Sequence, residues 1–495
     1  MGGLVGAAPW LLSACGSSHD CGFDGLDKQL QGTVVCEHDR GYSKARLMFN
    51  MRFDAIRPRA VAYCETVDDV ERVIAVARKN DLRISLRAGG HSYGGYSTGD
   101  GIVLDVSRMN DVLVDQAGKT ATVGAGTRLI DLYSMLWRRG LTVPAGSCPT
   151  VGIAGLALGG GIGFSARKLG LTCDNVRALT IVTAAREAVV ASEREHADLY
   201  WASRGGGGGN FGVVTQFRFA VHPVDTVSYY SIQWPWANAR EVVEAWQNWA
   251  PHAPDDLFAV CGLHADGDKS AGVSPVIGSA GQFFGSPAEL RALVQPLVNT
   301  AEPKQVTLRQ ATYMNAAMMW AGCTGSVAAC HLAGSAPSGT LDRWNFKGKS
   351  AYMTKPLSRP AIETLVRGIE RRQADPALAN GSVLMDAYGG AINRVEPEAT
   401  AFVHRDALCS LQFLASWDPR GGHALARANL RWIASFYDAM RPYLSGFAYQ
   451  NYVDPDLPDW QRAYYGSNLA RLVSVKRTYD PVDVFRFGQS IPTRI

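Results

Sequence analysis

Three glycine-rich stretches in the first 220 residues constrain the fold of this chain most strongly. They read RAGGHSYGGYSTGDG at 87–101, VPAGSCPTVGIAGLALGGGIG at 143–163 and SRGGGGGNFG at 203–212. Glycine allows sharp turns and a close approach of backbone to a bound group, and loops of this kind present backbone N–H groups to a pyrophosphate. The stretches indicate that the first 220 residues surround a ligand, and a nucleotide is the first expectation.

The common nucleotide motifs do not account for these stretches. No GxGxxG lies between an expected strand and an expected helix, and GxxxxGK[ST] is absent. Neither a standard Rossmann site nor a P-loop NTPase is therefore supported, and another nucleotide-binding architecture is required.

The hydrophobic pattern predicts a mixed chain of two domains, as expected for 495 residues. We expect a first domain over 36–222, a second over 223–444 that is rich in Trp, Tyr and Phe, and a segment 445–495 that returns to the first. The clearest expected helices cover 66–80, 128–139 and 468–478, and the clearest strands cover 84–86, 102–104, 179–183, 188–192 and 213–221.

Charge and cysteine spacing exclude some partners. A net charge of +4 without Lys/Arg runs argues against nucleic acid. The ten cysteines lack paired CxxC spacings, so we expect no metal site. Cys21 with Cys36, and Cys323 with Cys330, are close enough to close small disulfide loops, which persist in oxidising compartments.

The N-terminus indicates export. The first fourteen residues are apolar and too short to span a membrane, and they match the end of an export signal, so we assign residues 1–22 to a leader. Leu12 to Cys15 also matches a bacterial lipoprotein box with Cys15 as the lipidated residue. A cleaved signal, a lipid anchor and a small buried segment stay open.

His91 and Cys148 lie in two of the glycine stretches. Taken singly, a loop histidine is most often a turn or surface residue, and a lone cysteine is most often a small buried hydrophobe. Five strings together carry more weight: RAGGHS, PAGSCPTVGIAGLALGGGIG, RGGGGGNFGVVTQF, YQNYVD and YYGSNLARLVSVKRTYDPVDVF. In this order they resemble the berberine bridge enzyme-like oxidases of the vanillyl-alcohol oxidase superfamily, which include glucooligosaccharide oxidases.

The resemblance, which runs from about residue 50 to the C-terminus, implies an α+β flavoprotein. It implies a two-part FAD-binding domain of the PCMH type and a substrate domain with an antiparallel sheet covered by helices. His91 matches the residue that the family links to the 8α-methyl group of FAD, and Cys148 matches the residue linked to C6. Two tethers would retain the flavin in an open site and raise its redox potential.

Further cofactor contacts follow from the same resemblance. Val151 matches a position that gates oxygen in the family, where valine is typical of oxidases. One departure is GLALG at 155–159, where many relatives have a polar side chain. The other expected contacts are Arg87, Gly89, Gly90, Ser92, Gly152, Gly155, Asp174, Asn175, Gly207, Gly208, Asn210, Gly212 and Val213.

The chemistry implied is hydride transfer from an alcohol to flavin N5, assisted by a base that takes the hydroxyl proton. Tyr452 matches the base, with Tyr449 as the second choice. Asp386 and Tyr388 lie in a segment that resembles the substrate-facing strand and could tune the base or orient the substrate.

The function expected is an exported, bicovalent FAD-dependent oxidase that acts on a carbohydrate or oligosaccharide hydroxyl with O2 as acceptor, giving H2O2. Oxidation of a glycosylated or polyketide-like natural product is an alternative. A non-catalytic carbohydrate-binding lipoprotein of the same fold is another, and it differs because it would be colourless or inert. The oligomeric state stays open.

Overall fold

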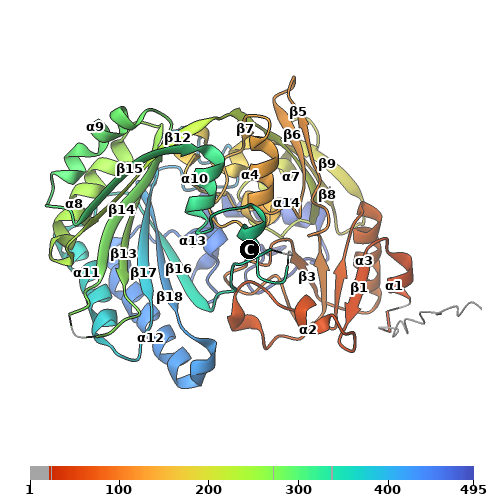
Figure 1. Cartoon of the computed structure of the whole chain (residues 1–495). Coiled ribbons are helices and arrows are strands. Elements are labelled where there is room, and N and C mark those ends of the chain that lie inside the picture. Colours follow the sequence, from red (N-terminus) through yellow and green to blue (C-terminus); the bar gives the residue numbers. More distant parts are fainter. Residues whose placement is uncertain (1–21, 24, 271, 336–337, 495) are drawn as a thin grey trace, which may run out of the picture.

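The molecule has two sheet systems (Figure 1). A four-stranded and a five-stranded sheet form the first, and a seven-stranded sheet forms the second. The glycine-rich stretches lie where the two systems meet. The computed structural model describes residues 22–494 apart from residues 24, 271 and 336–337. Within these residues, no helical segment has the length and apolar character needed to cross a lipid bilayer. Residues 1–21 of the proposed leader, with Cys15 and Cys21, lie outside the described residues.

A four-stranded sheet in the order β1-β2-β4-β3 begins the chain. Its strands are β1 (Thr33–Cys36), β2 (Ala60–Tyr63), β3 (Ile84–Arg87) and β4 (Ile102–Asp105), and β4 lies parallel to both β2 and β3. Helix α3 (Val67–Lys79) connects β2 to β3, and a capping box between Thr66 and Asp69 fixes its start as predicted. The first glycine stretch connects the parallel pair β3 and β4.

A five-stranded antiparallel sheet follows, in the order β5-β6-β10-β8-β9. Its strands are β5 (Val112–Asp115), β6 (Thr120–Gly124), β8 (Val176–Val182), β9 (Ala188–Ser192) and β10 (Val213–Ala220). Helix α4 (Leu129–Trp137) follows β6 and ends before Gly140, which has a positive φ. The third glycine stretch comes between α7 (Ala197–Ala202) and the central strand β10.

The second glycine stretch contains a helix that the glycine spacing did not predict. Helix α5 (Ile153–Leu158) buries Ile153, Ala154, Ala157 and Leu158. It is followed by the short helix α6 (Ala166–Leu169). Tertiary packing of these apolar side chains offsets the low helix propensity of glycine.

The large sheet is antiparallel throughout, in the order β15-β12-β14-β13-β17-β18-β16. Helices α8 (Ala239–Trp249), α9 (Pro287–Val298), α11 (Arg359–Ala374) and α12 (Gly422–Met440) share one hydrophobic core with it and cover its outer face (Figure 1). Its strands are β12 (Thr226–Trp234), β13 (Leu257–Ala265), β14 (Val276–Phe283), β15 (Gln305–Thr312), β16 (Phe346–Met353), β17 (Gly381–Ala387) and β18 (Cys409–Ser416). Its other face is not covered by these four helices.

The last fifty residues pack against the first sheet system. Helix α14 (Leu469–Tyr479) lies beside α7, and α13 (Trp460–Tyr465) precedes it. The buried Lys476 donates hydrogen bonds to the backbone oxygens of Asn210 and Phe485 and pairs with Asp480. The C-terminal segment therefore fixes the third glycine stretch through the backbone oxygen of Asn210.

The loop after α10 (Tyr313–Trp320) carries the predicted disulfide between Cys323 and Cys330, which the structure confirms. In the same loop, His331 Nε2 lies 3.1 Å from a carboxylate oxygen of Asp131, in α4. The loop thus ties the second sheet system to the first at the edge of the site.

Candidate active site

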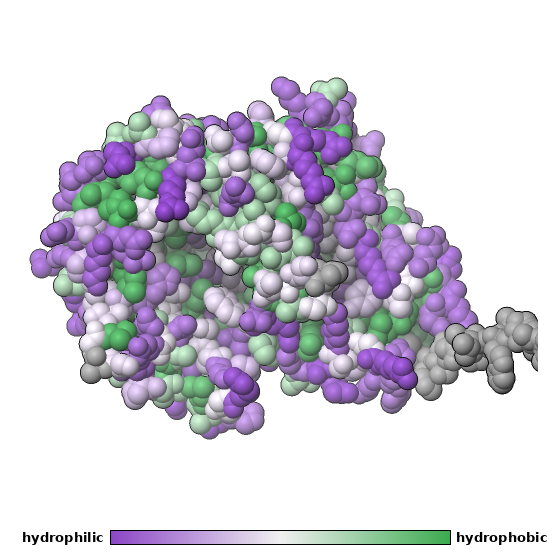
Figure 2. Space-filling view, viewed as in Figure 1, coloured by the Kyte–Doolittle hydropathy of each residue, from purple (hydrophilic) through white to green (hydrophobic). Residues whose placement is uncertain are grey.

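A cavity of about 620 Å³ lies where the two sheet systems meet. All three glycine stretches line it, together with residues 449–453 and the C-terminal Phe487 and Gln489. Figure 2 shows the surface hollowed beside α10, over the large sheet. A volume of this size is typical of a site for a cofactor or a drug-sized ligand.

Most residues predicted to contact the cofactor line this cavity. Gly155 faces open space, since a Cβ built there would meet nothing within 4 Å. The predicted residues in the lining are Arg87, Gly89, Gly90, His91, Ser92, Cys148, Val151, Gly152, Gly155, Gly207, Gly208, Asn210, Gly212 and Val213.

His91 is held as a neutral imidazole. Its ring stacks on Phe49 with centroids 4.0 Å apart, and its Nε2 lies 2.9 Å from the Thr150 hydroxyl oxygen. Burial, followed by the positive charge of Arg128, lowers the pKa of His91 to about 3. A neutral ring retains a lone pair on one nitrogen, which a nucleophile requires.

Cys148 carries a free thiol in the same cavity. The other free cysteines of the described residues, Cys64, Cys173, Cys261 and Cys409, are buried, whereas Cys148 is half-buried. Burial raises the pKa of the Cys148 thiol, and hydrogen bonds from Thr150 and the backbone of Val151 act in the opposite direction. Cys148 is thus the one free thiol of the described chain with access to the cavity.

The glycines permit contacts that a side chain would block. A Cβ on Gly152 would lie 2.4 Å from the backbone nitrogen of Gly89, so the first two glycine stretches touch here. Gly207 has a φ of +89°, which L side chains rarely adopt. Asn210 supports this loop rather than offering its side chain, because its amide donates to the Gly206 oxygen at 3.0 Å and accepts from the Ile491 N–H at 2.8 Å.

Two polar side chains of the first stretch are also internally engaged. The Arg87 guanidinium pairs with Asp105. The Ser92 hydroxyl accepts from the backbone N–H of Tyr96 at 3.0 Å. The cavity lining thus combines glycine backbone and apolar side chains with His91, Cys148 and a few further polar side chains, among them Gln412, Asn451 and Arg486.

A second cavity of about 370 Å³ opens on the free face of the large sheet. The two cavities share the lining residues Ser147, Ile162, Trp320, Leu384, Gln412 and Tyr452. Its polar lining includes Ser231, Gln233, His264, Ser279 and Asp386. A ligand there would therefore adjoin whatever occupies the first cavity.

Tyr452, the predicted base, lies at this junction. Its ring stacks on Tyr93, and the Tyr93 hydroxyl accepts a hydrogen bond of 2.6 Å from Gln412. Burial, followed by the nearby Tyr93 and Asp386, raises the pKa of Tyr452 well above 10. Tyr452 therefore keeps its proton at neutral pH unless another group takes it.

Asp386 lines the second cavity from β17. Burial raises its pKa to about 6, although a 3.2 Å hydrogen bond from Ser410 acts against this shift. The carboxyl group therefore changes protonation state close to neutral pH, which suits a group that exchanges protons during catalysis.

Tyr449 lines the first cavity with a constrained hydroxyl. The backbone N–H of Gly161 donates to it at 2.7 Å and the Asn451 amide at 2.9 Å, while burial raises its pKa. Tyr388, predicted to face the substrate, lines neither cavity. β17 ends at Ala387, and Tyr388 is buried in one cluster with Tyr449, with its hydroxyl 3.1 Å from that of Tyr352.

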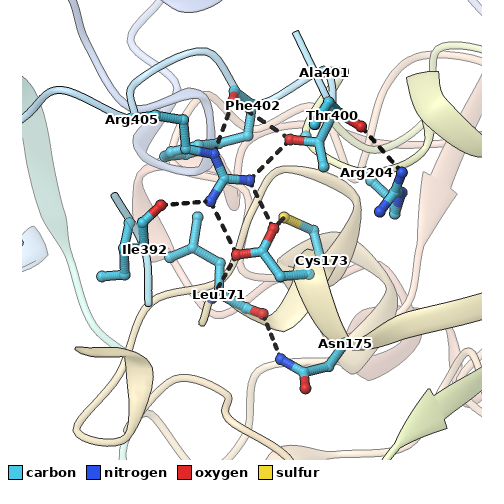
Figure 3. Close-up of polar contacts among 12 residues, drawn as sticks. Leu171, Cys173, Asn175, Arg204, Ile392, Thr400, Ala401, Phe402 and Arg405 are labelled. Atoms are coloured by element: carbon cyan, nitrogen blue, oxygen red, sulfur yellow. Dashed lines mark hydrogen bonds and ion pairs between the residues drawn. The ribbon is translucent and has the colours of Figure 1, made fainter. Parts of the chain in front are cut away.

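Asp174 and Asn175 also lie outside both cavities. Asp174 forms a two-pronged ion pair with the buried Arg405, with distances of 2.7 and 2.9 Å. Figure 3 shows the polar contacts that surround Arg405. The Asn175 amide donates to the backbone oxygens of Leu169 and Leu171. Asp174 therefore joins the segment after β17 to the first sheet system, and Asn175 stabilises its own loop, instead of contacting the cavity.

Thr150, Tyr93 and Gln412 are site residues that the sequence reasoning missed. Thr150 lies two residues after Cys148, and Tyr93 lies two residues after His91, so proximity to the predicted attachment residues was the available signal. Gln412 gave no signal, because only the pairing of β18 with β17 brings it to the cavity.

Comparisons with known proteins agree with this geometry. The family described as FAD binding domain matches residues 58–192, and the family described as berberine and berberine like matches residues 448–492. The FAD-linked oxidoreductase YgaK of Bacillus subtilis is 36% identical over 94% of this chain and 97% of its own length. A xylooligosaccharide oxidase of Thermothelomyces thermophilus is 28% identical over 99% of this chain and 98% of its own. The solved structure of BBE-like 1 from Physcomitrella patens is similar with a TM-score of 0.84 at 33% identity, covering 95% of this chain and 98% of that chain.

Proposed function

Because the chain belongs to the berberine bridge enzyme-like family of FAD-linked oxidoreductases, we propose that it oxidises a hydroxyl group of an oligosaccharide with FAD attached at His91 and Cys148. Dioxygen is the electron acceptor and hydrogen peroxide the product. The observation that carries the proposal is that a neutral imidazole and a free thiol line one cavity, which adjoins a second, polar cavity.

FAD, when bound, supplies the acceptor for the two electrons and the hydride that leave the alcohol carbon. The glycine stretches would hold it through backbone N–H groups, with Gly89, Gly152 and Gly207 lining the cavity. His91 and Cys148 would be its covalent anchors. Asp174 and Asn175 have no part in this proposal.

The hydroxyl proton of the substrate requires an acceptor. Since the pKa of Tyr452 is raised and that of Asp386 is about 6, Asp386 is the group that is ionised at neutral pH. We assign Tyr452 the role of passing the substrate proton on towards Asp386, and Gln412 with Tyr93 the role of fixing the Tyr452 ring. Tyr449, whose hydroxyl already accepts two hydrogen bonds, is a positioning residue here.

An oligomeric substrate is favoured by the shape of the sheet face. Gln412, Leu384, Gly262, Gly278 and Gln233 face one another in turn across five neighbouring strands. At about 4.8 Å between strands this row is roughly 19 Å long. Its ends are amides, which bind hydroxyl groups, and the His264 ring lies over Gly262 in its middle and adds another polar group. The similar xylooligosaccharide oxidase acts, by its name, on such a chain.

Two finer points belong to the same proposal. Val151, at the lining of the first cavity, would leave room for dioxygen to reach the flavin.

Export is supported by the apolar N-terminal residues and by the disulfide between Cys323 and Cys330, because disulfides persist in oxidising compartments.

Oxygen consumption tests the activity. Purified protein should be yellow, and it should consume O2 and release H2O2 with one or more xylo-, gluco- or chitooligosaccharides and much less with the parent monosaccharides. Consumption only with aromatic glycosides or polyketide-like alcohols would instead indicate the tailoring of a natural product. Yellow protein that consumes no oxygen with any of these compounds would contradict the proposed oxidase.

A further inference from the structure

Thr150 lies between the two residues proposed to carry the flavin. Its hydroxyl oxygen is 2.9 Å from His91 Nε2, and both its hydroxyl and its backbone N–H form hydrogen bonds to the Cys148 sulfur. We propose that the Thr150 hydroxyl is the shared positioning group that sets the protonation of His91 and Cys148 for covalent attachment. This inference rests on the proposed function.

One arrangement of protons serves both attachments. A threonine hydroxyl has one proton to donate and two lone pairs that accept. If it donates to the sulfur, it must accept from His91, so the imidazole proton lies on Nε2. The lone pair of the neutral ring is then on Nδ1. One hydroxyl group thereby keeps the ring nitrogen Nδ1 and the sulfur available as nucleophiles at the same time.

The surroundings of Cys148 make the hydrogen bond from the Thr150 hydroxyl necessary. Burial disfavours the thiolate of Cys148, which is the nucleophilic form, and the described residues provide no positive charge among the groups that lower its pKa. The opposing groups are the Thr150 hydroxyl and the N–H groups of Thr150 and Val151. The hydroxyl is the only one of the three that a substitution can remove without altering the backbone.

The chemistry of attachment balances with dioxygen. Each attachment forms a bond from sulfur or nitrogen to a flavin carbon and breaks an S–H or N–H bond and a C–H bond. Two protons and two electrons leave per bond, and dioxygen accepts them to become hydrogen peroxide. Thr150 is not consumed, and it acts only through the atoms that it holds.

The backbone of Thr150 is fixed independently of its hydroxyl. The Arg128 guanidinium donates to the backbone oxygens of Ala88 at 3.0 Å and Thr150 at 3.3 Å, which clamps the first two glycine stretches together. Thr150 is buried, and valine has the same β-branched shape. Thr150→Val should therefore keep the loop and remove only the hydrogen bonds.

The test measures how much of each attachment peptide carries flavin. Wild type, Thr150→Val and Thr150→Ser are expressed identically, denatured, digested and analysed by mass spectrometry, and non-covalent FAD is measured in the acid supernatant. Thr98→Val is the matched control, because Thr98 is a buried threonine of the first stretch whose hydroxyl has no partner and which does not line the cavity.

We expect Thr150→Val to bind FAD but to attach it about 10- to 100-fold more slowly, as when one hydrogen bond to a charged group is lost. The unmodified Cys148 and His91 peptides should accumulate, and Thr150→Ser and Thr98→Val should match wild type. If Thr150→Val is misfolded by circular dichroism, the pair Thr150→Ala and Thr150→Ser gives the same comparison. Full attachment at both peptides in Thr150→Val or Thr150→Ala would overturn the inference while leaving the proposed function intact. Absence of attachment in wild type would instead contradict the proposed function.

Discussion

Tyr93 and Tyr452 stack nearly parallel, with ring centroids 5.0 Å and planes 19° apart. Tyr93 comes from the first glycine stretch, two residues after His91, and Tyr452 comes from the segment that follows the large sheet. The contact therefore brings the proposed flavin anchor and the proposed proton-transfer group together from positions some 360 residues apart in sequence. Gln412 holds the Tyr93 hydroxyl from β18, so three segments meet at this point.

Removal of the Tyr452 hydroxyl should slow chemistry without loss of flavin. Tyr452→Phe keeps the stacked ring but cannot pass on a proton, and positioned acid–base groups contribute 10²- to 10⁴-fold. We expect flavin reduction by substrate, measured by anaerobic stopped-flow absorbance, to fall about 100-fold or more. Tyr443→Phe, which lies away from both cavities, is the control. An unchanged reduction rate in Tyr452→Phe would remove this residue from the mechanism.

The reduction rate should depend on pH through Asp386. Burial raises its pKa to about 6, so the carboxyl group is protonated below that pH and cannot accept a proton, whereas it is ionised above. We expect the rate to rise with pH through about 6 and then to level off. In Asp386→Asn the rate should be low and this rise should vanish. A rise that persists in Asp386→Asn would assign it to another group.

The Arg405–Asp174 ion pair should contribute strongly to stability, because both partners are buried. Removing one partner leaves an unpaired buried charge, which costs about 3–5 kcal/mol. Asp174→Asn and Arg405→Met should each lower the free energy of unfolding by this order, and the double variant should lose less than the sum. Denaturant unfolding measures it, with Arg420→Met, at an exposed ion pair with Asp418, as the control that should change little. Additive losses in the double variant would show that the two residues act independently.

Val151 should affect the oxygen reaction more than the alcohol reaction. It lines the cavity and is partly exposed, so an extra methylene in Val151→Ile would fill space beside the flavin. We expect reoxidation by O2 to slow several-fold while anaerobic reduction by substrate stays near the wild-type rate. Equal slowing of both reactions would point to a general distortion of the site.

The sequence was most informative where local chemistry decides the outcome. The capping box at Thr66 and the stop at Gly140 are local signals, and both expected helices are present. The small loop between Cys323 and Cys330 is likewise closed by a disulfide. The glycine stretches indicated the cavity lining because glycine is needed wherever two backbones nearly touch, as at Gly89 and Gly152.

Residues that depend on long-range packing could not be assigned in this way. Asp174 follows a glycine stretch as a ligand contact would, but its partner, Arg405, is 231 residues away. Tyr388 continues the alternation of Asp386, yet the strand ends between them and the ring turns into the protein. Gln412 enters the site only through the register of β17 and β18.

The direct test of the central claim is the intact mass of the denatured, acid-precipitated protein, followed by mapping of its peptides. We predict an increase equal to one FAD, which digestion assigns to a cross-linked pair of peptides containing His91 and Cys148. In His91→Ala and Cys148→Ala the flavin should stay attached through the remaining residue, and it should be lost only in the double variant. A wild-type protein that releases all its flavin on denaturation would contradict the account.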